Sequence, residues 1–173
     1  MKGAVQPPEQ RNGKEERLAL LMEAYANEVL RLCYFQLRDR MQAEDAMQET
    51  FLKAYRRLDT VRGSEKAWLM KIALNCCRDV QRGAWFRHVD GRRALEDLPP
   101  AACAFDERAD SLVREVMALP PKYRQAILMR YYHEMTQREC ASALGLSESG
   151  FSRRLARAQA LLKAKLERWD WDV

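Results

Sequence analysis

Apolar side chains recur every three or four residues along most of this chain, and strict alternation of apolar and polar residues is rare. That spacing gathers apolar side chains on one side of a helix, because residues three and four apart are neighbours on its surface. In the first half of the chain the pattern predicts helices at about 15–37, 41–58 and 67–81. The inner face of the first helix is lined by Leu18, Leu21, Met22, Tyr25, Val29, Leu32 and Cys33.

The second half has the same period, together with clear start and stop signals. Helices are predicted over residues 106–119 and 121–132, with a proline at position 121 that suits a first helical turn. Thr136 and Glu139 form a capping-box pattern, which opens a short helix that ends at Gly145. Ser147 is a good N-cap for a long last helix. We therefore expect an all-α protein.

Residues 88–105 interrupt this pattern, because they carry Gly91, Pro99 and Pro100 and no sustained apolar stripe. The chain therefore divides into two small helical domains joined by a flexible linker. We expect a disordered tail at 1–14, an N-terminal domain at 15–87, the linker at 88–105 and a C-terminal domain at 106–169.

The composition supports a helical protein and indicates its cellular location and the redox state of its cysteines. The 173 residues are 47% apolar and 32% charged, with only seven Gly and six Pro. No apolar leader or 18-residue apolar run is seen, so we expect a cytoplasmic protein without membrane insertion, whose five cysteines are reduced. Neither histidine pairs with a cysteine at a metal-binding spacing, and we expect no metal or cofactor. Cys76-Cys77 could form a redox switch, although free cysteine is more often a small buried hydrophobe.

The charge is distributed in blocks along the chain. Residues 62–93 hold eight bases against three acids, and residues 147–169 hold six bases against two acids. Between them, residues 95–110 hold five acids and one base. Two basic blocks are therefore separated by an acidic segment. The basic blocks are typical of proteins that bind polyanions such as nucleic acids.

The region from 136 to 162 has the layout of a helix-turn-helix, in which the second helix enters the major groove of DNA. Arginine can contact guanine edges or phosphates, and serine can serve either role. A solvated basic helix is the plainer alternative, but the capping box, glycine turn, serine cap and arginine cluster occur in the order that DNA binding requires. The outward residues near the start of the last helix are Ser149, Ser152, Arg153, Arg154 and Arg157.

The third predicted helix carries a second basic face. Its polar positions follow a 4-3-4 spacing, beside a polar loop at 59–66 that could enclose an unstacked base. Trp85 and Phe86 either stack on bases or close the core, and the core is favoured. By itself this helix leaves DNA contact and plain solvation equally open. The face comprises Lys71, Asn75, Arg78 and Arg82.

The second predicted helix has an acidic face apart from its apolar stripe. Residues at helical spacing place two carboxylates, an amide and a leucine together, namely Asp45, Gln48, Glu49 and Leu52. Such a face is either solvated surface or a docking site for a basic partner.

Taken together, these parts resemble a known family. The strings AEDAMQETFLKAY (43–55), WLMKIALNCCRD (68–79) and the stretch from LPPKYRQAILMRYY to LARAQALL (119–162) are similar to bacterial RNA polymerase sigma factors of the extracytoplasmic-function (ECF) group of the sigma-70 family. The resemblance covers about residues 18–166. It implies two helical domains, a promoter-directing role in transcription initiation, and no enzyme activity or small-molecule substrate.

The resemblance also implies partners and residue roles. The second helix would dock on a coiled coil in the beta-prime clamp of core RNA polymerase, through Asp45, Gln48, Glu49 and Leu52. The last helix would read the minus-thirty-five element of promoter DNA. The acidic linker would pass the polymerase active centre, in contact with the beta subunit, and an anti-sigma factor is a common partner. The third helix and the loop before it would read and open the minus-ten element, through Arg62, Ser64, Lys66, Asn75, Arg78, Asp79 and Arg82.

Two other functions compete with this interpretation. A stand-alone helix-turn-helix regulator would explain the C-terminal half but would leave the features at 43–82 unused. Enzymes are disfavoured because the chain has no Gly-rich phosphate loop and no histidine beside a nucleophile. One departure from the family concerns Gly150 and Phe151, which stand where a Thr-Val pair is common. Glycine there removes one side chain from the DNA-facing set.

Overall fold

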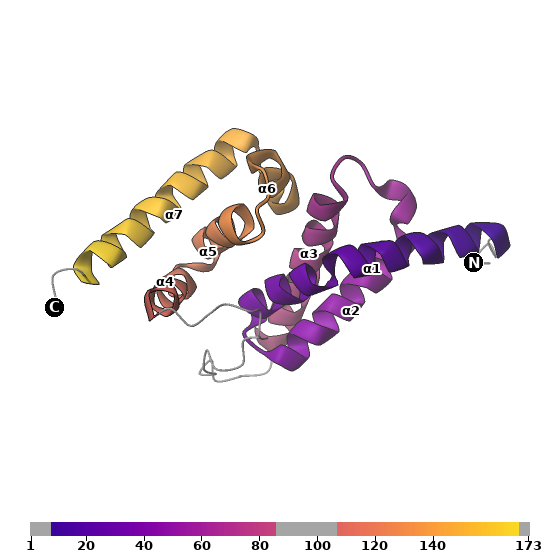
Figure 1. Cartoon of the computed structure of the whole chain (residues 1–173), viewed down its shortest axis with the longest axis horizontal. Helices are drawn as coiled ribbons and strands as arrows, with labels where there is room; N and C mark the ends of the chain where they lie inside the picture. Colours follow the sequence, from indigo (N-terminus) through magenta and orange to yellow (C-terminus); the bar gives the residue numbers. More distant parts are fainter. Residues whose placement is uncertain (1–7, 86–106, 170–173) are drawn as a thin grey trace. The chain divides into compact units, whose positions relative to one another are not determined.

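A computed structural model describes residues 8–85 and 107–169, and within these ranges every regular element is helical. The described helices form two units, α1–α3 and α4–α7, as the sequence predicted (Figure 1). None of the described helices is long and apolar enough to span a membrane.

The first unit packs α1 (Pro8–Leu37), α2 (Arg40–Arg56) and α3 (Glu65–Trp85) against one another, with a short 3₁₀ turn, η1 (Leu58–Thr60), after α2 (Figure 1). Each helix turns most of its predicted apolar stripe toward the centre of the unit, away from water. The side chains at this centre include Val29, Leu32, Cys33, Phe51, Leu69, Met70 and Leu74.

The first helix differs from its prediction at two points. It begins at Pro8, so residues 8–14, which the sequence assigned to a disordered tail, are helical. Two long-range ion pairs lie at the end of this stretch and just after it, from Lys14 to Asp59 and from Arg17 to Glu65. Such partners cannot be found from local periodicity. Met22, expected on the inner face, is 43% exposed and lies outside the core.

The sharp joint between α1 and α2 has a local cause. Arg38 adopts a left-handed backbone with φ of 56°, which stops α1. Asp39 then caps α2, and its carboxylate accepts a hydrogen bond of 3.0 Å from the backbone N–H of Gln42. These two residues bring α2 back along α1.

The second unit contains α4 (Glu107–Met117), α5 (Pro121–Ile127), a π-helical segment η3 (Leu128–Tyr132), α6 (Gln137–Leu144) and α7 (Glu148–Trp169). The proline at 121 occupies the first turn of α5, as predicted. The π-helical segment continues α5 where the sequence predicted regular helix to about residue 132. The buried core of this unit includes Phe151, Met129, Met135, Cys140 and Ala158.

Candidate docking face and nucleic-acid interfaces

The exposed face of α2 carries the predicted docking residues. Asp45 and Gln48 are exposed, and Leu52 is 54% exposed. Met41, which is 75% exposed, continues the same row one turn earlier, because positions 41, 45, 48 and 52 follow helical spacing. Sequence reasoning did not assign this methionine to the face, although that spacing would have revealed it. The row is therefore two polar groups bracketed by two apolar ones.

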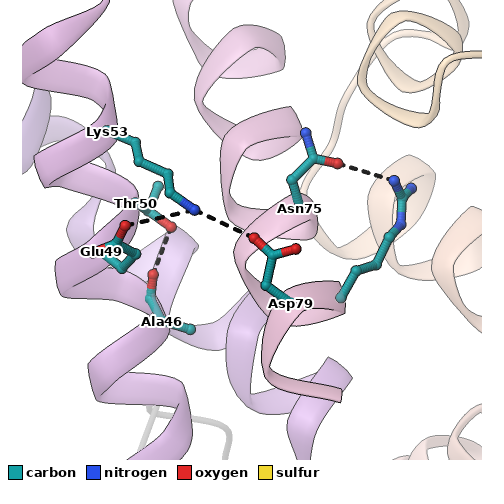
Figure 2. A network of polar contacts seen from close by, with 7 residues as sticks. Ala46, Glu49, Thr50, Lys53, Asn75 and Asp79 are labelled. Atoms are coloured by element: carbon teal, nitrogen blue, oxygen red, sulfur yellow. Dashed lines mark hydrogen bonds and ion pairs between the residues drawn. The ribbon is translucent and has the colours of Figure 1, made fainter. Parts of the chain in front are cut away.

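Glu49, the fourth predicted docking residue, is half-buried and turns toward α3. The Lys53 ammonium lies 3.5 Å from its carboxylate and 3.3 Å from the carboxylate of Asp79 on α3 (Figure 2). Burial lowers the pKa of Lys53, but Cys76 and the two carboxylates raise it by more, so the ammonium stays charged. One cation thus links α2 to α3, an arrangement that sequence reasoning missed.

The basic face of α3 is organised as predicted. Lys71, Asn75, Arg78 and Arg82 are all exposed along one side, while the opposite side is buried in the core. Arg78 donates a hydrogen bond of 2.9 Å to the side-chain oxygen of Asn75, which aligns the two groups (Figure 2). Asp79 lies beside this row, and Lys53 compensates its negative charge. The row can therefore present a net positive surface to phosphates.

The connection between α2 and α3 and the first turn of α3 hold the three other residues predicted to contact the minus-ten element. Ser64 caps α3: its hydroxyl accepts from the backbone N–H of Ala67 at 3.2 Å. Lys66 lies 2.7 Å from the carboxylate of Glu28 on α1. Arg62 is exposed, next to Gly63, whose φ of 73° makes the turn. Of the three predicted residues, Arg62 reaches furthest into solvent.

The second unit contains the predicted helix-turn-helix. Thr136 and Glu139 form both hydrogen bonds of the capping box at the start of α6. Gly145 ends that helix in the left-handed conformation, with φ of 67°. Ser147 caps α7, and its hydroxyl accepts from the backbone N–H of Gly150 at 3.1 Å. Each local signal found in the sequence is thus confirmed.

The predicted recognition residues share the outer side of α7. Ser149, Ser152, Arg153 and Arg157 are exposed and Arg154 is half-buried, opposite the buried Phe151 and Ala158. A Cβ at Gly150 would stand 3.0 Å from the capping hydroxyl of Ser147, which is a tight contact. A larger residue there would therefore require this hydroxyl to shift by a few tenths of an ångström.

Several sequence expectations fall outside these sites. The acidic linker, residues 88–105, and Phe86 lie outside the described residues, as does the tail before residue 8. Trp85 is the last residue of α3. Cys33, Cys76, Cys77 and Cys140 are buried free thiols. Burial raises the pKa of Cys76, and a hydrogen bond with Cys77 together with burial raises that of Cys33, so both stay protonated at neutral pH.

Comparison with known proteins matches each unit to a protein-family domain. Residues 21–87 match Sigma-70 region 2, and residues 109–162 match Sigma-70, region 4. The chain is 30% identical over 159 residues to the ECF RNA polymerase sigma factor SigM of Bacillus subtilis, covering 86% of this chain and 94% of that protein. It is 25% identical over 172 residues to SigW of the same organism, an ECF RNA polymerase sigma factor, covering 90% and 92%.

The fold has a solved counterpart. The sigma factor RpoE from Bartonella quintana, crystallised in complex with the anti-sigma factor NepR, superposes with a TM-score of 0.67 at 20% identity. The match covers 88% of this chain and 96% of that one. At this identity the likeness concerns the fold alone.

Proposed function

The chain belongs to the ECF group of the sigma-70 family of RNA polymerase sigma factors, and we propose that α2 is its docking helix, α3 its minus-ten reader and α7 its minus-thirty-five reader. As a sigma factor it directs RNA polymerase to promoters. The observation that carries the assignment of surfaces is the layout of the first unit. There, an exposed acidic and apolar row on α2 and an exposed basic row on α3 belong to one packed domain.

The α2 row suits a basic helical partner such as the beta-prime coiled coil. Exposed Met41 and Leu52 supply apolar area, and Asp45 and Gln48 between them supply charge and hydrogen bonding. Interfaces commonly combine apolar anchors with polar groups that fix the register and speed association. Glu49 shares Lys53 with Asp79, so we assign it a smaller direct part in docking.

The α3 row and the connection before it suit promoter DNA that is being opened. Lys71, Arg78 and Arg82 can neutralise phosphates, while Asn75 and Arg62 can reach base edges. Asp79 would repel phosphates if it were uncompensated. We therefore propose that it acts through its ion pair with Lys53 and does not contact DNA itself.

The exposed side of α7 suits duplex DNA. Arg153 and Arg157 lie one turn apart near the helix start, where a recognition helix contacts base edges, and Ser149 and Ser152 flank them. We propose that these four residues, with Arg154 at the rim, read the minus-thirty-five element.

The remaining assignments follow the family. We propose that the chain works in the cytoplasm, catalyses no reaction itself, and meets the beta subunit through the linker. The solved complex of RpoE with NepR supports an anti-sigma partner, which would cover the docking and DNA-binding faces. Two small domains on a linker gain little from each other until the polymerase fixes their spacing. Weak promoter binding by the free chain is therefore expected.

Docking can be tested by co-elution of the purified chain with bacterial core RNA polymerase on a sizing column. We expect the wild type to co-elute and an Asp45→Arg/Leu52→Asp variant to elute apart from the polymerase. Glu23→Arg is the matched control, because it reverses an exposed carboxylate on a different helix, α1. If the variant co-elutes as well as the wild type, the docking face lies elsewhere.

The DNA-binding faces can be tested with the reconstituted holoenzyme on a randomised promoter library. Arg153→Ala/Arg157→Ala should relax base preference in the upstream element, and Arg78→Ala/Arg82→Ala should weaken the downstream element. Lys122→Ala on α5 is the control for loss of a positive charge. Each lost phosphate contact should also lower the slope of log affinity against log salt by about 1. Unchanged preferences in both elements would contradict the assignment.

A further inference from the structure

We propose that the first turns of α1 hold the α2–α3 connection (residues 57–64) in its binding shape, with Lys14 and Arg17 as the positioning residues. The proposal rests on the proposed function, because that connection would read the minus-ten element. Lys14 and Arg17 lie ahead of residue 21, where the match to Sigma-70 region 2 begins, so the arrangement adds to the matched domain.

Ion pairs from α1 bracket the connection on both sides. Lys14 pairs with Asp59 in η1, on the side where the chain leaves α2. Arg17 lies 2.8 Å from the carboxylate of Glu65, the first residue of α3. Glu28, further along α1, pairs with Lys66 at 2.7 Å. The N-terminal turns of α1 run past this connection (Figure 1), so one rigid helix fixes both ends of it.

The geometry of these pairs shows that they join α1 to the connection and to the start of α3. Lys14 and Arg17 are three residues apart and therefore share one side of α1. The side chain of Lys14 is only 17% exposed, which means that its stem is packed against the protein. The paired residues are 45 and 48 positions apart in the sequence, so the ion pairs join separate elements of the unit.

The connection also has its own anchors and an exposed tip. Leu58 is buried at its start, and Ser64 caps α3 at its end. Arg62 and Gly63, between them, are exposed. Holding the ends reduces the conformational freedom that would be lost when the tip binds a base, and so favours binding by pre-organisation. Because surface ion pairs are weak and screened by salt, the effect should be modest and should fade at high ionic strength.

The first test measures hydrogen exchange in the free, full-length chain. Arg17→Glu places two carboxylates together at Glu65 and should speed exchange of residues 58–66 by about 3- to 10-fold. Exchange within the core of α2 and α3 should stay unchanged. Arg17→Glu/Glu65→Arg restores an ion pair of reversed sense and should restore protection. Glu16→Arg, on the adjacent side of α1, is the matched control. Equal protection in the wild type and Arg17→Glu would overturn the proposal.

The second test asks whether the ion pairs of Lys14 and Arg17 affect which promoters the holoenzyme selects. Holoenzyme containing Lys14→Gln/Arg17→Gln is compared with wild-type holoenzyme on a randomised promoter library. We expect preference for the minus-ten element to fall about 3- to 10-fold, with preference for the minus-thirty-five element retained. A uniform loss over both elements would indicate a merely structural role and overturn the proposal. If wild-type holoenzyme does not form, the proposed function fails. The hydrogen-exchange experiment would still show whether Lys14 and Arg17 hold the connection.

Discussion

Substitution of Gly145 by alanine isolates the backbone requirement of the helix-turn-helix turn. Gly145 ends α6 with φ of 67° and ψ of 37°, and its N–H donates to the carbonyl of Ser142 at 3.2 Å. Leu146 donates to Ala141 at 2.9 Å, which completes the helix end. A Cβ at Gly145 would meet nothing within 4 Å, so crowding adds no cost. What remains is the left-handed conformation, which costs an L-residue about 1–2 kcal/mol.

Hydrogen exchange measured segment by segment is the suitable assay, because a chain of two units need not unfold in one step. A loss of about 1–2 kcal/mol in the second unit should speed globally protected amides of α6 and α7 about 5- to 30-fold. Amides of α1–α3 should be unaffected. Gly145→Asn should lower the stability of the second unit less than Gly145→Ala does, because asparagine adopts the left-handed conformation more readily than alanine.

Gly13→Ala is the matched control for this change. A Cβ at Gly13 would also meet nothing within 4 Å, but the φ of Gly13 lies outside the left-handed region, inside helix α1. Alanine there should stabilise α1 locally by up to about 1 kcal/mol. The same substitution should therefore act with opposite sign at the two sites. Slower exchange or no change in α6 and α7 of Gly145→Ala would refute the reasoning.

Single contacts elsewhere in the two units lead to three more predictions. Ser147→Ala should destabilise α7 by about 0.5–2 kcal/mol, seen as faster exchange of its first-turn amides, whereas Ser147→Asp should keep the cap; equal exchange in both would contradict this. A double-mutant cycle of Lys53→Ala and Asp79→Ala should give a coupling of about 0.3–1 kcal/mol in urea unfolding of the first unit, and zero coupling would refute the link. Because the folded pKa of Cys33 is raised above the ordinary 9.0, its stabilising contribution is fully present below about pH 9 and is lost progressively as the pH rises above that value. Wild type should therefore lose more stability than Cys33→Ser between pH 7.5 and 10, and an equal loss would count against it.

The fold was largely predictable because its signals are local. The capping box at Thr136, the glycine at 145 and the serine at 147 each act through hydrogen bonds with groups only three or four residues away. The apolar period likewise identified the buried faces of α3 and α7. The turns of α1 before residue 15 were missed because they are polar and lack an apolar stripe. Lys14, at their end, pairs with Asp59, which is far away in the sequence.

The candidate site was predictable to a smaller extent. Helical spacing correctly grouped exposed residues on α2, α3 and α7, because exposure follows from the position of the core. Spacing cannot show which charges meet across helices. Lys53 therefore escaped notice although it pairs with two predicted site residues, and Ser64 proved to cap α3. Partners between elements depend on packing, which a single sequence does not display.

Because Lys53 pairs with both Glu49 and Asp79, it can couple the proposed docking face on α2 to the proposed DNA-binding face on α3, and the strength of its ion pairs limits that coupling. A polymerase cation that approaches Glu49 competes with Lys53, which can then pair more fully with Asp79 and reduce its repulsion of phosphates. Both carboxylates are partly exposed, so the coupling should not exceed about 1 kcal/mol, or about fivefold in affinity. Placing two separate DNA-binding units at a fixed spacing can raise affinity by about 10²–10⁴. The dependence of promoter binding on polymerase should therefore come mainly from the spacing of the two units.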